Sequence, residues 1–211
     1  PHTIARDVLV RRDWQFPSSL ALVVGSTDDP GLLTSWMSNP IGPQTMFGGL
    51  EDGFILGAIV VPSLPPTAFG TFRGGIGREG LTGIQGWNEY VDHFVVAGYF
   101  EGQPGNRDMD VASYYATLNG PYGMGMLSST FFGGGADERP AMLGAWNATP
   151  ASSFATYGFG EHAGGGVTVD ARARVNVVGG TVSMDYPWLT SPPGRPRSGL
   201  LLDAVRTVVD L

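Results

Sequence analysis

Residues 166–178 read GVTVDARARVNVV and show most clearly the pattern from which the fold class follows. Apolar residues recur at every second position of this segment, and polar residues fill most of the positions between them. Successive side chains of an extended strand point to opposite faces of a sheet, so the alternation predicts one half-buried β-strand. Its polar face would meet water or a neighbouring chain, and its apolar face would consist of Val167, Val169, Ala171, Ala173, Val175 and Val177.

Eight further runs resemble this one in being short, rich in Val, Tyr, Phe and Thr, and bounded by turn-forming residues. They lie at residues 7–16, 18–26, 53–63, 92–102, 109–118, 123–134, 152–160 and 180–189. No regular alternation with long amphipathic helices accompanies them, so the sequence predicts an all-β, antiparallel sandwich or barrel forming a single domain over residues 1–211. Short helices are expected at most at residues 31–39 and 200–211, either of which also suits a strand. Long loops are expected at 62–88, 101–107, 133–150 and 189–199.

The composition excludes several classes of function. The chain has a formal net charge of −7, and all 12 of its basic residues are scattered arginines, so we expect no strong direct binding to nucleic acid. The absence of lysine and cysteine excludes Schiff-base chemistry, thiol catalysis, disulfides and thiolate metal sites. No apolar run approaches the length of a membrane span, so no membrane association is expected. Only 15% of the residues are charged, so the chain either exposes neutral loops or has much of its surface covered by neighbouring chains.

Catalytic signatures are missing from the sequence, and we expect no enzymatic activity, cofactor or metal site. There is no nucleophile elbow, zinc-protease motif or phosphate loop. The three histidines do not suggest a metal centre, and His93 is expected to be a strand residue with a hydrogen-bond partner. Paired carboxylates of a sandwich-fold glycoside hydrolase remain an alternative, with candidates Glu89, Glu101, Asp108, Asp110, Glu161 and Asp170.

Aromatic residues suggest a second alternative, a carbohydrate-binding sandwich. Sugar rings stack on exposed aromatic side chains, and the same spacing also suits core packing or burial between subunits. The candidates are Trp87 and Tyr90, Tyr99 and Phe100, Tyr114 and Tyr115, and Phe131 and Phe132.

Five segments together resemble the capsid proteins of picorna-like viruses. HFVVAGYFEG followed by MDVASYYATL is similar to paired strands across the middle of that barrel, and GMGMLSSTFFGGG resembles a strand that runs into a glycine-rich loop. VVGGTVSMDYPWLTS is similar to a strand that ends in a proline and an aromatic residue, and DVLVRRDWQF resembles the first barrel strand. The resemblance implies a jelly-roll β-sandwich that acts as a structural subunit of an icosahedral virion.

The resemblance also implies partners and an interface. The partners would be other capsid subunits, and a host receptor is a further partner of such proteins. Pro187 removes a backbone donor where a strand ends, so the neighbouring rings would be presented to an adjoining chain. The expected interface residues are Tyr186, Pro187 and Trp188.

Overall fold

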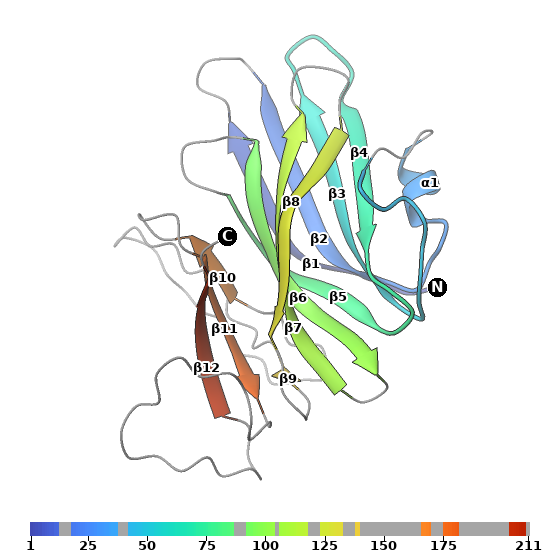
Figure 1. Cartoon of the computed structure of the whole chain (residues 1–211). Helices are drawn as coiled ribbons and strands as arrows, with labels where there is room; N and C mark the ends of the chain where they lie inside the picture. The colour runs from blue at the N-terminus through green and yellow to red at the C-terminus, as the bar shows by residue number, and fades with distance from the viewer. Residues whose placement is uncertain are drawn as a thin grey trace.

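The computed structural model describes residues 1–12, 18–37, 42–86, 92–103, 106–117, 123–132, 138–139, 166–169, 175–181 and 203–209. Most of these residues lie in antiparallel strands, which confirms the predicted all-β class (Figure 1). The first sheet contains β1 (Thr3–Arg12), β2 (Ser19–Thr27), β3 (Asp52–Val60) and β4 (Thr67–Arg73). The second contains β5 (Glu79–Gly86), β6 (His93–Gln103), β7 (Asn106–Thr117) and β8 (Gly123–Phe132).

A third, smaller sheet lies to one side of the other two (Figure 1). It contains β10 (Gly166–Val169), β11 (Val175–Thr181) and β12 (Asp203–Val209), and the short β9 (Glu138–Arg139) pairs with β11. The helix α1 (Leu32–Trp36) follows β2. No helix in the described part of the chain is long and apolar enough to cross a membrane.

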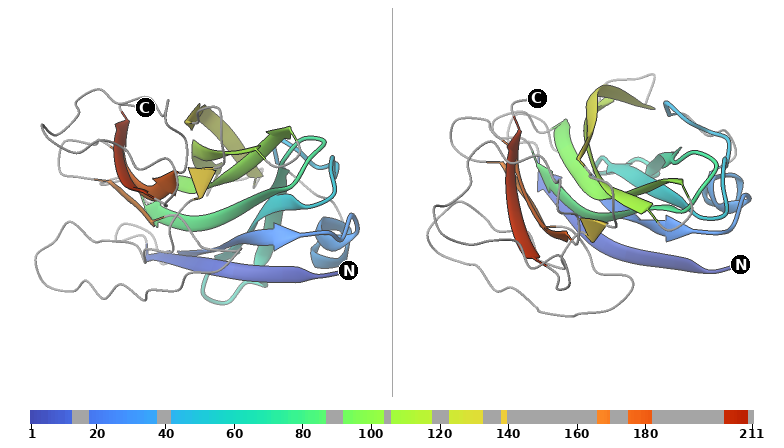
Figure 2. Two further views of the ribbon diagram at one scale, coloured as in Figure 1. Left: turned by 90° about the horizontal axis from the view of Figure 1, so that it is seen from below. Right: turned by 60° about the horizontal axis from the view of Figure 1, so that its bottom comes forward.

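The two large sheets lie in separate layers, with β1–β4 in one and β5–β8 in the other (Figure 2). In both sheets each strand pairs with its neighbours in sequence, in the orders β1-β2-β3-β4 and β5-β6-β7-β8. A jelly roll instead places strands that are distant in sequence beside one another. The described pairings therefore confirm an antiparallel sandwich and do not confirm the jelly-roll connectivity.

The main core fills the space between the two layers. It contains Leu20, Leu22, Ile55 and Phe69 from the first sheet, and Phe94, Val96 and Tyr114 from the second, together with other buried residues of both. The rings of Phe94 and Tyr114 stack with their centroids 5.6 Å apart. Burial of each such side chain contributes about 1.5–3 kcal/mol to folding, so this core is the principal source of stability.

Glycines make room for several large rings in this sandwich. A Cβ on Gly57 would lie 2.3 Å from the ring of Phe69, and a Cβ on Gly80 would lie 2.6 Å from the ring of Tyr99. The missing side chain thus lets an aromatic ring on the adjacent strand lie flat across the glycine. The glycine-rich residues 62–88, which we expected to be a long loop, contain β4 and β5, so that expectation is wrong.

Two other expectations need correction. Residues 166–178 do not form one strand, because β10 and β11 pair as antiparallel strands with Val167 opposite Val177 and Val169 opposite Val175. Residues that oppose each other in two paired antiparallel strands lie on the same face of the sheet. Apolar and polar residues therefore keep alternating from β10 to β11, and the sequence pattern gives no sign that the chain changes direction. The loop expected at residues 101–107 is also largely strand, since β6 runs to Gln103 and β7 begins at Asn106.

Most of the other expected strands are confirmed, with shifted ends. The first expected strand begins earlier, at Thr3, and the C-terminal segment forms the strand β12. The helix expected at residues 31–39 is the short α1. The expected strand at 152–160 and the loop at 189–199 lie outside the described residues, as do most of the loop at 133–150 and of the strand at 180–189.

Candidate functional site

The outer face of the β1–β4 sheet, which points away from the main core, is apolar. Directly opposed residues of antiparallel strands lie on the same face, and two such rows cross all four strands. One row is Val8, Val23, Leu56 and Gly70, and the next is Val10, Ala21, Ala58 and Ala68. Two rows of apolar residues across an outward-facing sheet are unusual in a protein that has water on that side.

A second layer covers one half of this face. Leu33 and Met37, which lie in α1 and directly after it, are buried in a small cluster with Phe54 and Phe72. Val23, Leu56, Phe47 and Ala68 pack against the same cluster. A Cβ on Gly70 would lie 2.9 Å from the end of Met37 and 3.1 Å from Leu33, so this glycine allows the layer to approach the sheet closely.

The other half of the face is open. Val8 and Val10 on β1 are 59% and 67% exposed, and Val60 at the end of β3 is 42% exposed. Ala21 and Ala58 lie between them and are half-buried. We call these five residues the outer patch: Val8, Val10, Ala21, Ala58 and Val60. A contiguous apolar surface of this kind is typical of a protein-binding surface.

The outer patch continues to a free strand edge. Among the described strands β1 pairs with β2 alone, so the backbone groups along its other edge make no ladder bonds in the described sheets. A bulge interrupts the β1–β2 register between Ala5 and Asp7, and from Asp7 to Arg12 the register is regular. An edge strand is a template for pairing with a further strand, but the N–H of Val8 on this edge already donates to Asp7 Oδ1 over 2.8 Å.

Two carboxylates lie close together at one end of the sandwich, where β3 and β5 begin. Asp52 and Glu79 are 0% and 2% exposed. A Cβ on Gly74 would lie 2.3 Å from Asp52 Oδ1 and 3.1 Å from Glu79 Oε2, so both carboxylates border the same small space. The backbone N–H of Gly48 donates to Asp52 Oδ2 over 2.8 Å, while Asp52 Oδ1 has no hydrogen-bond partner.

The pKa values of Asp52 and Glu79 are both raised. Burial raises the pKa of Glu79 to about 7; the Asp52 and Glu101 carboxylates add to the rise, and the N–H groups of Gly75 and Gly77 oppose it. Burial likewise raises the pKa of Asp52, against the N–H groups of Gly48 and Gly49. Two buried like charges are costly, so near neutral pH the pair favours holding a proton.

A polar pocket lies near the beginnings of β3 and β5, on the side away from Asp52 and Glu79. Glu51 and Arg78, the sequence neighbours of the two buried carboxylates, form a parallel bridge, and Arg78 Nη1 lies 3.6 Å from Glu51 Oε2. The pocket has a volume of about 320 Å³ and is lined by His2, Ile4, Ser26, Asp28, Glu51 and Arg78. Its lining contains no aromatic side chain among these residues, so it lacks the stacking surface of a typical sugar site.

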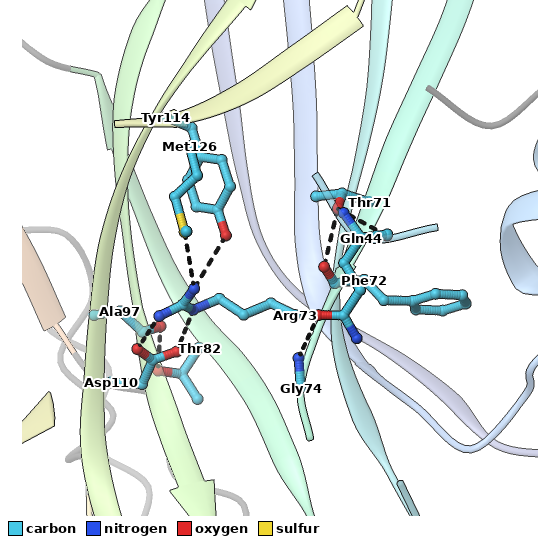
Figure 3. A network of polar contacts seen from close by, with 10 residues as sticks. All are labelled: Gln44, Thr71, Phe72, Arg73, Gly74, Thr82, Ala97, Asp110, Tyr114 and Met126. Atoms are coloured by element: carbon cyan, nitrogen blue, oxygen red, sulfur yellow. Dashed lines mark hydrogen bonds and ion pairs between the residues drawn. The ribbon is translucent and has the colours of Figure 1, made fainter. Parts of the chain in front are cut away.

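A buried ion pair between β4 and β7 joins the two large sheets (Figure 3). Arg73 at the end of β4 donates through Nε and Nη2 to the Asp110 carboxylate on β7, and its Nη1 lies 3.4 Å from both Tyr114 Oη and Met126 Sδ. The two charged side chains are 12% and 5% exposed. Burial lowers the pKa of Arg73, but its bonds with Asp110 raise it by more, so the pair stays charged.

Three of the carboxylates expected for a glycosidase lie in the described part of the chain. Asp110 is bound to Arg73, Glu101 lies at the end of β6, and Asp108 lies two residues before Asp110 on β7. Glu89, Glu161 and Asp170 lie outside the described residues. The carboxylates that do lie together, Asp52 and Glu79, were not among the candidates, because only the pairing of distant strands brings them close.

The expected sugar-stacking platform is not formed by the described aromatic residues. Tyr99 and Tyr114 are 4% and 2% exposed and belong to the interior, while Tyr115 on the opposite face of β7 is 38% exposed. Trp87 and Tyr90 lie outside the described residues, as do the expected interface residues Tyr186, Pro187 and Trp188. His93 begins β6, and its Nδ1 lies 2.8 Å from Asp92 Oδ1, which confirms the expected strand residue with a polar partner.

Within the described ranges, no group of three or more histidine, aspartate or glutamate side chains is arranged to hold a metal ion. Comparison of the chain with protein-family models, with curated proteins and with solved structures finds no match. The function is therefore inferred from the sequence and from the properties of the described structure.

Proposed function

We propose that this chain is a structural subunit that assembles with other protein chains, and that the assembly is an icosahedral virus capsid located in the virion. The single observation that carries the assembly is the outer patch, an uncovered apolar area that adjoins a free strand edge. Exposed apolar area is costly in an isolated protein and stabilising when a partner covers it, since burial contributes roughly 25 cal/mol per Å².

The composition supports the same proposal. Only 15% of the residues are charged, and interfaces of permanent assemblies are depleted in charge and enriched in apolar residues. The low charge extends over the whole sequence, as expected for a subunit that meets neighbours on several sides.

The capsid is the finer part of the proposal and rests on the sequence resemblance. A jelly-roll connectivity belongs to it, and the sequential order of the described strands weighs against that connectivity. The proposed assembly does not depend on the jelly roll, because the outer patch and the free edge of β1 are properties of this sandwich whatever its connections elsewhere.

A glycosidase is less well supported than an assembly protein. Its two carboxyl groups must contact a sugar and a water molecule. Asp52 and Glu79 are 0% and 2% exposed, so the described pair is enclosed by protein.

Electron microscopy of the native material tests the proposal. The expected result is closed shells of uniform diameter that contain this chain in many copies. Material that contains only dispersed single chains at every concentration, together with specific binding on a glycan array, would support the carbohydrate-binding alternative and contradict the proposal.

A further inference from the structure

We propose that a proton held by the buried pair Asp52 and Glu79 keeps the two large sheets joined at this end of the sandwich, and that this end opens more readily as the pH rises. The device is built into the fold and consists of the two carboxylates and the backbone bridge beside them. It goes beyond the proposed function and does not depend on it, because every contact involved lies within one chain.

The inter-sheet bridge consists of the backbone contacts between the residues that enter β3 and β5. Glu51 and Arg78 form a parallel bridge, and the N–H of Glu79 donates to the carbonyl of Glu51 over 2.8 Å. The N–H of Leu50 donates to the carbonyl of Gly77, also over 2.8 Å. Because β3 belongs to the first large sheet and β5 to the second, these hydrogen bonds tie the two sheets together.

The carboxylates of Asp52 and Glu79 lie directly beside this bridge, since they begin β3 and β5. They border the same small space next to Gly74. Neither Asp52 Oδ1 nor either carboxylate oxygen of Glu79 has a partner that meets hydrogen-bond geometry. Buried charges without partners are costly, and a proton on one carboxyl group removes one charge and supplies a hydrogen-bond donor.

The charged groups around the pair do not neutralise it. Glu101, at the end of β6, adds a further negative charge near Glu79. Arg78 lies beside Glu51, and its side chain is 51% exposed. Within the described ranges, no arginine or histidine forms an ion pair with Asp52 or Glu79. Two further titratable side chains near the inter-sheet bridge are bound to other carboxylates: Tyr99 to Glu51 and Arg73 to Asp110.

Loss of the proton therefore favours opening of the inter-sheet bridge. Once this end opens, the carboxyl group of Glu79 meets water and regains its ordinary pKa of 4.5, whereas in the closed form its pKa is about 7. The closed form thus binds the proton more tightly, and the open fraction rises about tenfold per pH unit between these two values. Above about pH 7 both forms have lost the proton, so the open fraction becomes constant.

Amide hydrogen exchange between about pH 4.5 and pH 8 tests this inference, with the rates corrected for the intrinsic effect of pH. The amides of Leu50 and Glu79 report on the inter-sheet bridge. The reference is the amide of Ala116 on β7, which donates to the carbonyl of Asp92 over 2.8 Å. We expect Leu50 and Glu79 to be less protected than Ala116, and their protection to fall on the order of 100-fold as the pH rises to about 7.

Two variants assign this pH dependence to the buried pair. Glu79→Gln should lose most of it, because the titrating group is gone. Glu51→Gln keeps both buried carboxylates and is the matched control that should retain the pH dependence. If Glu79→Gln fails to fold, Asp52→Asn supplies the check, since removing the neighbouring charge should move the fall in protection to lower pH. A fall at an unchanged pH in Asp52→Asn would count against the pair.

Three results would overturn the inference. If Leu50 and Glu79 exchange only as slowly as Ala116 at every pH, this end opens only when the whole chain unfolds. Protection that does not change with pH, or a full pH dependence in Glu79→Gln, would mean that the pair does not control the opening. Addition of calcium chloride at pH 8 gives the third, since restored protection of the two amides would mean that the space takes a cation in place of the proton.

Discussion

At the scale of single residues, several glycines of the described structure have no room for a side chain. Gly74 illustrates this, because a Cβ there would lie 2.3 Å from Asp52 Oδ1 and 2.6 Å from its Cγ. Asp52 is fully buried and cannot move aside without losing its hydrogen bond from Gly48. Gly75, the next residue, has ordinary room, since its Cβ would lie 3.4 Å from the Phe100 ring.

We predict that Gly74→Ala destabilises the protein by about 1–3 kcal/mol, the usual cost of overpacking a buried site. Gly75→Ala is the matched control and should change the free energy of unfolding by less than about 1 kcal/mol. Urea denaturation of the two variants measures the difference. Equal stability of both variants would show that the space beside Asp52 is not filled as described.

The raised pKa of Glu79 leads to a prediction about pH. A carboxyl group whose pKa rises on folding stabilises the folded state while the proton is held, and this contribution is lost as the pH rises. For Glu79 the contribution is complete below its ordinary pKa of 4.5 and is lost as the pH rises through about 7. Glu79→Gln removes the titrating group while keeping the shape of the side chain.

We therefore predict that Glu79→Gln gains stability relative to the unsubstituted chain as the pH is raised from about 4.5 to about 8. Thermal unfolding of Glu79→Gln and of the unsubstituted chain over this pH range measures the difference. A difference between Glu79→Gln and the unsubstituted chain that stays constant with pH would mean that Glu79 does not titrate in this range.

At the scale of elements, Arg73 and Asp110 hold the edge of one sheet against the other. Removing one partner of a buried ion pair leaves an uncompensated charge, which typically costs about 3–5 kcal/mol, whereas replacing both by apolar residues is often nearly neutral. We predict that Arg73→Met and Asp110→Leu are each strongly destabilising and that the double variant is more stable than either single one.

A double-mutant cycle by chemical denaturation measures this coupling. Arg78→Met is the control, because Arg78 is half exposed and lies 3.6 Å from its partner Glu51, so its removal should cost no more than about 1 kcal/mol. Additive losses in the double variant would contradict a coupled pair between the sheets.

The sequence predicted those strands whose inner and outer faces differ. In β2, Leu20, Leu22 and Val24 are buried in the core while Ala21 and Val23 face outward, so the alternation is visible. In β4 and β5, glycines stand where large residues are expected, because Met37 and Leu33 approach Gly70 and the ring of Tyr99 lies against Gly80, so the pattern is lost. In β10 and β11 the alternation of apolar and polar residues is uninterrupted, so the sequence predicted one strand where the structure has two.

The candidate site was less predictable than the fold. Asp52 and Glu79 are 27 positions apart, and the pairing of strand ends brings them together. The alternation of β1 marks Val8 and Val10 as one face, but it cannot say which parts of that face α1 covers. The low charge content predicts a protein covered by others, which stays a prediction, and the expected interface at residues 186–188 lies outside the described residues.

At the scale of the whole molecule, the β1–β4 sheet has two apolar faces. One is buried against β5–β8, and half of the other is covered by α1 and the residues near it. The uncovered half adjoins the edge of β1 that has no partner among the described strands, so the exposed apolar area and this edge occur at the same place. The proposed associating surface would account for both.

Sedimentation velocity of the chain over a range of concentrations tests this account most directly, using the double variant Val8→Glu/Val10→Glu and the control Ile76→Glu. Ile76 is 87% exposed but lies away from the outer patch, in the turn between β4 and β5. The account predicts that the unsubstituted chain and Ile76→Glu associate as concentration rises, and that the double variant stays folded and associates at least roughly 30-fold more weakly, as expected when about 2 kcal/mol of interface energy is lost. An unsubstituted chain that is monomeric throughout, or a double variant that associates as well as the control, would contradict it.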